Sequence, residues 1–264
     1  MHTRRFLSLL ALLVTAAPAA AQTQAYKEVD VKGGATITGR VVFEGTPPAF
    51  KFPIGKDGAA CCVEGEKEKP SPRLAVGKAN GVKNSVVYLT EVREGKSFPS
   101  SKPMLDQTKC VFEPHVVVVP KGAKLAIRNS DPVLHNTHGF LKQSDAFNLA
   151  FPTKDKTLEV PMRREGHVAI RCDAGHTWMS AHVFVAAHPY FAVTAEDGTF
   201  SLDNVPPGSY TLRVWHEGWK VEKKGDSYSC SEDVQLDVPL QVAAEQKTDL
   251  QFSLSEAGKL AVKK

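Results

Sequence analysis

Alternation of apolar and polar residues dominates this chain and predicts β-strands. Residues 35–43 alternate and are rich in β-branched side chains, and residues 86–89 form a short apolar run. Similar short runs, separated by Gly, Pro, Asp and Asn, occupy residues 158–161, 167–171, 182–186, 191–194, 200–202, 210–215 and 250–254. No long segment has a clean helical period. The pattern therefore predicts an all-β fold built from many short strands.

Turn residues refine this prediction. Residues 116–119 and 125–127 are apolar and flank Pro120-Lys121-Gly122, which is typical of a hairpin. Residues 51–73 and 218–232 are polar and rich in turn formers, so we expect loops there. Residues 255–264 are expected to form a tail.

The N-terminal residues predict the compartment. Arg4 and Arg5 precede the apolar run 6–14, and small residues follow up to Ala21. This is typical of a secretory signal peptide, residues 1–21, cleaved near Ala21. The apolar run is too short to span a bilayer, and no later segment is long enough. We expect a periplasmic or secreted protein without a membrane anchor.

The five cysteines predict disulfides and one free thiol. They are Cys61, Cys62, Cys110, Cys172 and Cys230, and an exported protein can form disulfides. An odd number leaves one thiol over, and Cys172 is the natural remainder because a metal can hold it. We expect Cys110 to pair with Cys61 or Cys62 and Cys230 to pair with the other. The alternative is a single bridge with Cys230 reduced.

Residues 172–179 carry the most informative chemistry. Cys172, His176 and Met179 fall within eight residues, and His135 lies upstream beside a second histidine, His138. A thiolate, two imidazoles and a weak thioether are the donor set of a blue-copper site. Singly, Cys172 could be a small core residue and Met179 could simply pack. Together they predict copper as the cofactor.

The same residues resemble those of the cupredoxins. His135-Asn136-Thr137-His138 resembles the His-Asn-x-His stretch of amicyanin-like cupredoxins, and the run from Cys172 resembles their Cys–His–Met loop. The similarity covers residues 102–187. It implies a Greek-key β-sandwich and a mononuclear copper that transfers single electrons. His135, Cys172 and His176 would then be equatorial ligands, and Met179 the axial one.

One residue departs from that family pattern. Gly175 makes the spacing Cys-x3-His rather than Cys-x2-His. The longer spacing also resembles part of the dinuclear copper loop of cytochrome c oxidase, but that centre needs a second Cys in the loop, which is absent here. A mononuclear site is favoured. The sequence does not determine its colour or its reduction potential.

Three further residues are expected around the copper rather than on it. By the resemblance, Asn136 ties the two ligand segments together through hydrogen bonds. His138 matches a family histidine that is not a ligand. His115 lies in an apolar strand, where a hydrogen-bonded core or supporting role is expected. The family also implies electron exchange through an exposed edge of His176.

A second resemblance concerns the rest of the chain. Residues 191–200, with their Asp-Gly turn, lead into Pro206-Pro207-Gly208 and a further strand. This resembles carboxypeptidase regulatory-like, transthyretin-type β-sandwich domains. We expect such a sandwich from residues 33–99 plus 190–254, with the cupredoxin domain inserted. The alternative is a small N-terminal domain followed by two others in series.

These features predict an exported copper-binding protein that exchanges electrons with a redox protein partner. The net charge of +4 is too small to indicate nucleic acid. No acid–base pair or substrate pocket is evident, so neither an enzyme nor a small-molecule substrate is expected. Two alternatives stay open: copper sequestration or delivery, and a binding module whose metal is structural.

Overall fold

The computed structural model describes residues 25–54, 66–225 and 227–263. Within these ranges the chain is all-β, apart from one 3-10 turn, η2 (Lys78–Asn80). The all-β prediction is therefore confirmed. None of the described residues belongs to a helix long and apolar enough to cross a membrane. The predicted signal peptide, residues 1–21, lies outside the described residues.

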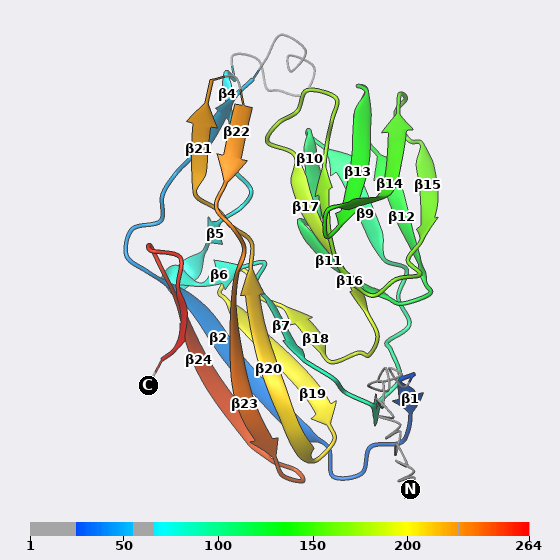
Figure 1. The fold of residues 1–264 in the computed structure, drawn as a ribbon, viewed down its shortest axis with the longest axis vertical. Helices are drawn as coiled ribbons and strands as arrows, with labels where there is room; N and C mark the ends of the chain where they lie inside the picture. The colour runs from blue at the N-terminus through cyan, green and yellow to red at the C-terminus, as the bar shows by residue number, and fades with distance from the viewer. Residues whose placement is uncertain (1–24, 55–65, 226, 264) are drawn as a thin grey trace, which may run out of the picture.

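One β-sandwich is built from a single stretch of the chain, drawn in green in Figure 1. Its larger sheet has the strand order β11 (Val116–Pro120), β17 (Ser180–Ala186), β16 (Gly166–Arg171), β13 (His135–Leu141), β14 (Ser144–Phe151). Its smaller sheet has the order β10 (Val111–Glu113), β9 (Met104–Thr108), β12 (Lys124–Asn129), β15 (Thr157–Pro161). Buried residues from both sheets form one core. We refer to this unit as the inserted sandwich.

A second β-sandwich takes its strands from both sides of that stretch. One sheet has the order β18 (Phe191–Val193), β7 (Val86–Leu89), β20 (Gly208–His216), β23 (Val234–Val242). The other has the order β19 (Thr199–Val205), β2 (Ala35–Glu44), β24 (Lys247–Ser255), β25 (Leu260–Val262). Every second residue of β2 is buried, as its alternating sequence predicts. We refer to this unit as the surrounding sandwich.

Four two-stranded ribbons complete the fold of the described residues. They pair β1 (Lys27–Glu28) with β8 (Glu94–Gly95), β3 (Lys51–Pro53) with β4 (Glu68–Pro70), β5 (Ala75–Val76) with β6 (Val82–Lys83), and β21 (Val221–Lys224) with β22 (Ser227–Cys230). The loops expected at 51–73 and 218–232 thus contain strands. Phe52 and Tyr228 explain why, since their rings lie 5.1 Å apart and pack on the core of the inserted sandwich.

The hairpin predicted across residues 116–127 is wrong. β11 pairs in parallel with β17, whereas β12 pairs with β9 and β15 in the opposite sheet. The turn at Pro120 therefore carries the chain from one sheet of the sandwich to the other. Its flanking strands face each other across the core instead of sharing hydrogen bonds.

The two sandwiches meet at a small apolar interface. Val116 and Phe184 of the inserted sandwich pack with Val86 and Trp215 of the surrounding one. The rings of Phe184 and Trp215 lie 4.9 Å apart, centroid to centroid. This contact packs β11 and β17 of the inserted sandwich against side chains of β7 and β20 of the surrounding one.

Candidate metal centre

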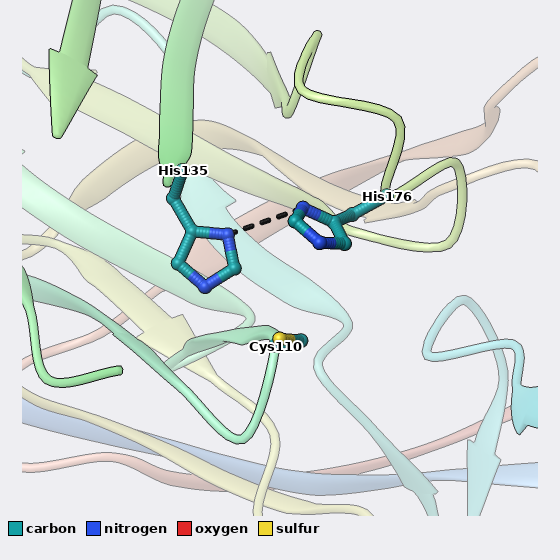
Figure 2. A group of neighbouring side chains, drawn as sticks. All are labelled: Cys110, His135 and His176. Carbon is teal, nitrogen blue, oxygen red and sulfur yellow. Dashed lines mark hydrogen bonds between the residues drawn. The ribbon is translucent and has the colours of Figure 1, made fainter. Parts of the chain in front are cut away.

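His135 is the first residue of β13, and its ring is fully buried. Its Nε2 lies 2.9 Å from Oδ2 of Asp131, which stands four residues earlier in the chain. A carboxylate accepts a hydrogen bond, so Asp131 holds the hydrogen of His135 on Nε2. Nδ1 of His135 then keeps its lone pair, and it is hydrogen-bonded to Nδ1 of His176 at 3.2 Å (Figure 2).

The second ligand segment is the loop between β16 and β17. The backbone N–H of Cys172 donates to the carbonyl of Met179 at 3.3 Å, and the N–H of Met179 donates to the carbonyl of His176 at 2.9 Å. Gly175 adopts φ +85°, a left-handed conformation that glycine takes without strain. This closed loop places Sγ of Cys172 3.6 Å from Nδ1 of His176.

Asn136 joins the two ligand segments. Its backbone N–H donates to Sγ of Cys172 at 3.4 Å, and its side-chain Oδ1 accepts from the N–H of Asp173 at 3.2 Å. Its Nδ2 donates to Oδ1 of Asn148 at 2.6 Å, which holds the amide in place. Asn136 therefore fixes the distance between the Cys172 loop and the start of β13.

Met179 and Trp178 complete the apolar side of the site. Both are buried in the core that also holds Cys172. The indole N–H of Trp178 donates to the carbonyl of Cys110 at 2.7 Å, and its ring packs edge-on against His176 at 5.4 Å. Trp178 thus packs against His176 on this side of the site.

Cys110 lies beside the two histidines but has a different role. Figure 2 shows its sulfur near both rings, and the three ligand-type atoms lie within 4.8 Å of one another. Cys110 is disulfide-bonded, so it offers no thiolate to a metal. Cys172 and Cys230 are free thiols, which overturns the predicted bridge to Cys230 because that side chain stays reduced and exposed. Cys61 and Cys62 lie outside the described residues.

Burial sets the acid–base behaviour of the site. Burial raises the pKa of the Cys172 thiol, although backbone N–H groups of Asn136, Ala174 and His176 oppose this. Burial also lowers the pKa of His135, and Asp131 opposes that shift. The side chains therefore favour a neutral imidazole, which is the form that binds metals.

The expected exposed edge of His176 is not found. This residue is only 4% exposed, because Trp178 and the loop itself lie against its ring. A route for electrons through a bare imidazole edge is therefore absent at this position.

The structure separates the two supporting histidines. Nδ1 of His138 lies 2.6 Å from Oδ2 of Asp173, next to Cys172, so His138 contacts the loop that carries Cys172. His115 lies elsewhere, at the interface between the sandwiches, where its Nε2 contacts Oε1 of Glu217. It supports Glu217 rather than the Cys172 site.

Glu217 is the centre of this second group of side chains. His182 Nε2 lies 2.9 Å from its Oε2, and Arg73 donates to the same oxygen at 3.0 Å. Burial alone would raise the pKa of Glu217, but His115 and His182 outweigh it and hold that pKa well below its usual range. The carboxylate is therefore ionised inside the protein.

Sequence reasoning missed Asp131 and Glu217. Asp131 stands four residues before His135, and an acidic residue at that distance from a ligand histidine is a usable signal. Glu217 directly follows His216 at the end of a strand, but nothing near it in sequence indicates His115 or His182. Their contact depends on the packing of the two sandwiches.

Comparison with known proteins identifies one sequence family and several solved structures. Residues 188–243 match the model of the second β-sandwich domain of BOS complex subunit NOMO1-like proteins. No curated protein matches the chain. A purple cupredoxin from Nitrosopumilus maritimus is 17% identical, with a TM-score of 0.27, over 32% of this chain and 100% of that one.

Two further structures give similar values. Amicyanin from Paracoccus versutus is 19% identical, with a TM-score of 0.29, over 34% of this chain and 86% of that one. A Cu-containing nitrite reductase from Thermus scotoductus is 15% identical, with a TM-score of 0.29, over 34% and 24% of the two chains. At such scores these likenesses do not define a function, and the case for a metal rests on the side-chain geometry.

Proposed function

We propose that this chain binds one copper ion at Cys172, His135, His176 and Met179, and that it transfers single electrons. The observation that carries this proposal is the convergence of three donor atoms. Nδ1 of His135 lies 3.2 Å from Nδ1 of His176, which lies 3.6 Å from Sγ of Cys172. A soft thiolate, two imidazoles and a buried thioether fit copper in both oxidation states.

The chain's own residues prepare this site. When bound, copper supplies a one-electron couple. Asp131 holds the His135 ring so that Nδ1 faces inward. The N–H of Asn136 donates to the Cys172 sulfur, and hydrogen bonds to that sulfur tune the potential of such sites. The buried indole of Trp178 excludes water from the side of His176.

The domain assignment belongs to the same proposal. We assign residues 102–187 to a cupredoxin-type sandwich and residues 33–99 plus 190–254 to a carboxypeptidase regulatory-like one. The two-sheet cores of both units and the β-sandwich family match at 188–243 support this assignment. The N-terminal sequence supports export to the periplasm or medium, and electron transfer requires a redox protein partner.

Copper sequestration or delivery is the second candidate, and the burial of His176 favours it. A ligand that is 4% exposed gives no direct edge for electron exchange. A buried ion also leaves slowly, which suits storage. Rapid, reversible voltammetry of the loaded protein would support electron transfer. A site that releases copper to an acceptor protein without redox cycling would support delivery.

Copper loading followed by visible spectroscopy tests the proposal. The parent protein should bind one Cu(II) and show an intense band from the Cys172 thiolate, and Cys172→Ser should abolish it. Cys230→Ser is the matched control, because Cys230 is a second free thiol among the described residues and is exposed. A colourless copper complex in the parent, or equal loss of colour in both variants, would contradict the proposal.

A further inference from the structure

A second group of metal-binding side chains lies between the two sandwiches. His115 immediately precedes β11, and His182 lies in β17 beside it, since the N–H of His182 donates to the carbonyl of His115 at 2.8 Å. Glu217 follows β20 of the surrounding sandwich. The three side chains therefore come from two sandwiches and meet at one place.

Their donor atoms are already close together. One ligand atom from each residue lies within 4.8 Å of the others. Nε2 of His182 lies 2.9 Å from Oε2 of Glu217, and Nε2 of His115 contacts Oε1. The residues are 6%, 4% and 2% exposed for His115, His182 and Glu217. Small side-chain rotations would bring all three atoms to the ~2.0–2.2 Å that zinc requires.

We propose that His115, His182 and Glu217 bind a divalent zinc-type ion that joins the inserted and surrounding sandwiches. Two imidazoles and one carboxylate form a His2Glu ligand set, which zinc uses widely. The site holds nitrogen and oxygen donors only, so it differs chemically from the sulfur-containing site at Cys172. The inference does not depend on the proposed copper function.

The surroundings of His182 favour metal binding through Nε2. Its other ring nitrogen, Nδ1, lies 2.8 Å from Nε2 of His167. A proton on Nδ1 donated to His167 leaves the lone pair on Nε2, facing Glu217. A ligand histidine commonly uses its second nitrogen in this way, which fixes both the tautomer and the ring orientation.

Arg73 opposes the ion and sets how tightly it binds. Its Nη1 donates to Oε2 of Glu217 at 3.0 Å and to the carbonyl of Gly218 at 3.2 Å. The guanidinium neutralises the carboxylate and repels a bound cation at short range. Oε1, on the His115 side, is the oxygen left for the metal. Removing the charge of Arg73 should therefore tighten zinc binding.

Equilibrium dialysis against Zn²⁺ with metal analysis tests the site in the Cys172→Ser background, which removes the thiolate of the first site. This variant should retain one tightly bound Zn²⁺ that raises its unfolding temperature. Adding Glu217→Gln, which keeps the side-chain size, should weaken binding by roughly 10–100-fold or more. Adding Arg73→Gln should instead tighten it. His188→Gln is the control, because His188 is a buried histidine outside the group. This variant should leave the zinc affinity unchanged.

Three outcomes would overturn the inference. One is a folded Cys172→Ser protein that binds no Zn²⁺. Another is equal affinity with and without Glu217→Gln, and His182→Ala repeats this comparison with a second ligand. The third is a loss of zinc affinity in the His188→Gln control as large as that in Glu217→Gln. Circular dichroism of each metal-free variant establishes that it is folded. A parent protein that fails to form a coloured copper site would refute the proposed function, but the number of Zn²⁺ ions bound to the Cys172→Ser variant would be unchanged.

Discussion

Asp131 contacts both the proposed ligand His135 and a strained turn, so its substitution tests two roles at once. Its carboxylate accepts hydrogen bonds from the backbone N–H groups of Lys109 and Cys110, both at 2.7 Å, and from Nε2 of His135 at 2.9 Å. Lys109 and Cys110 both have left-handed backbones, with φ of 52° and 53°. Such conformations persist only where the surroundings hold them.

The loss of stability expected for Asp131→Asn follows from these three hydrogen bonds. An asparagine presents one oxygen and one NH2 group, so it can keep the two bonds at Oδ2 but turns a donor toward the N–H of Lys109. A hydrogen bond to a charged group contributes ~1.5–3 kcal/mol, and a neutral one ~0.5–1.5 kcal/mol. Losing one and weakening two lowers the free energy of unfolding by about 3–5 kcal/mol. Copper affinity should fall by roughly 10–100-fold.

Urea unfolding of the metal-free protein and copper competition with a chelator measure the two effects. Asp155→Asn is the matched control, since Asp155 pairs with Arg128 on the surface with a side chain 58% exposed. An exposed pair contributes less than about 1 kcal/mol. If Asp131→Asn behaved like Asp155→Asn in both assays, Asp131 would have no role in holding His135 or the turn.

Three other outcomes are expected. Met179→Leu should retain copper and raise its potential by voltammetry, because a lost donor disfavours Cu(II); complete loss of copper would exclude a weak axial role. His135→Ala should abolish the coloured site, whereas His138→Ala, which removes contacts to Asp173 and Asp145, should leave the spectrum nearly intact; the reverse result would move the ligand role to His138. Burial lowers the pKa of His188 from 6.5 to about 4, so only the unfolded chain takes up this proton between those values. Stability should fall as the pH drops through that window, and His188→Gln should flatten the fall in urea unfolding at pH 7 and 4.5; an unchanged slope would contradict this origin.

Local patterns predicted the strands because side-chain alternation depends only on neighbouring residues. Residues 35–43 became β2, and 210–215 became the centre of β20. The same signal was available in Val234–Val242, where apolar and polar residues alternate, but that strand was not predicted. The Cys172 loop was also predictable from the sequence, since three of the proposed ligands lie within eight residues.

Pairing partners were not predictable in this way, because they depend on contacts far apart in the chain. The turn at Pro120 has hairpin residues, yet the strands on either side pair in different sheets. Cys230 is a free thiol, although the predicted export would allow it to form a bridge. Glu217 meets His115 only because Trp215 and Phe184 pack together at the interface.

The insertion of one sandwich into the other has a consequence for the order of folding. Thr38 of β2 bonds to Thr248 of β24, 210 residues later, so the surrounding sandwich cannot close until nearly the whole chain is available. All strands of the inserted sandwich, from β9 to β17, precede β19 and β24. Because the chain is synthesised from its N-terminus, the inserted sandwich can fold first. The Cys172 site can then assemble early, whereas the Glu217 site can form only when the two sandwiches dock.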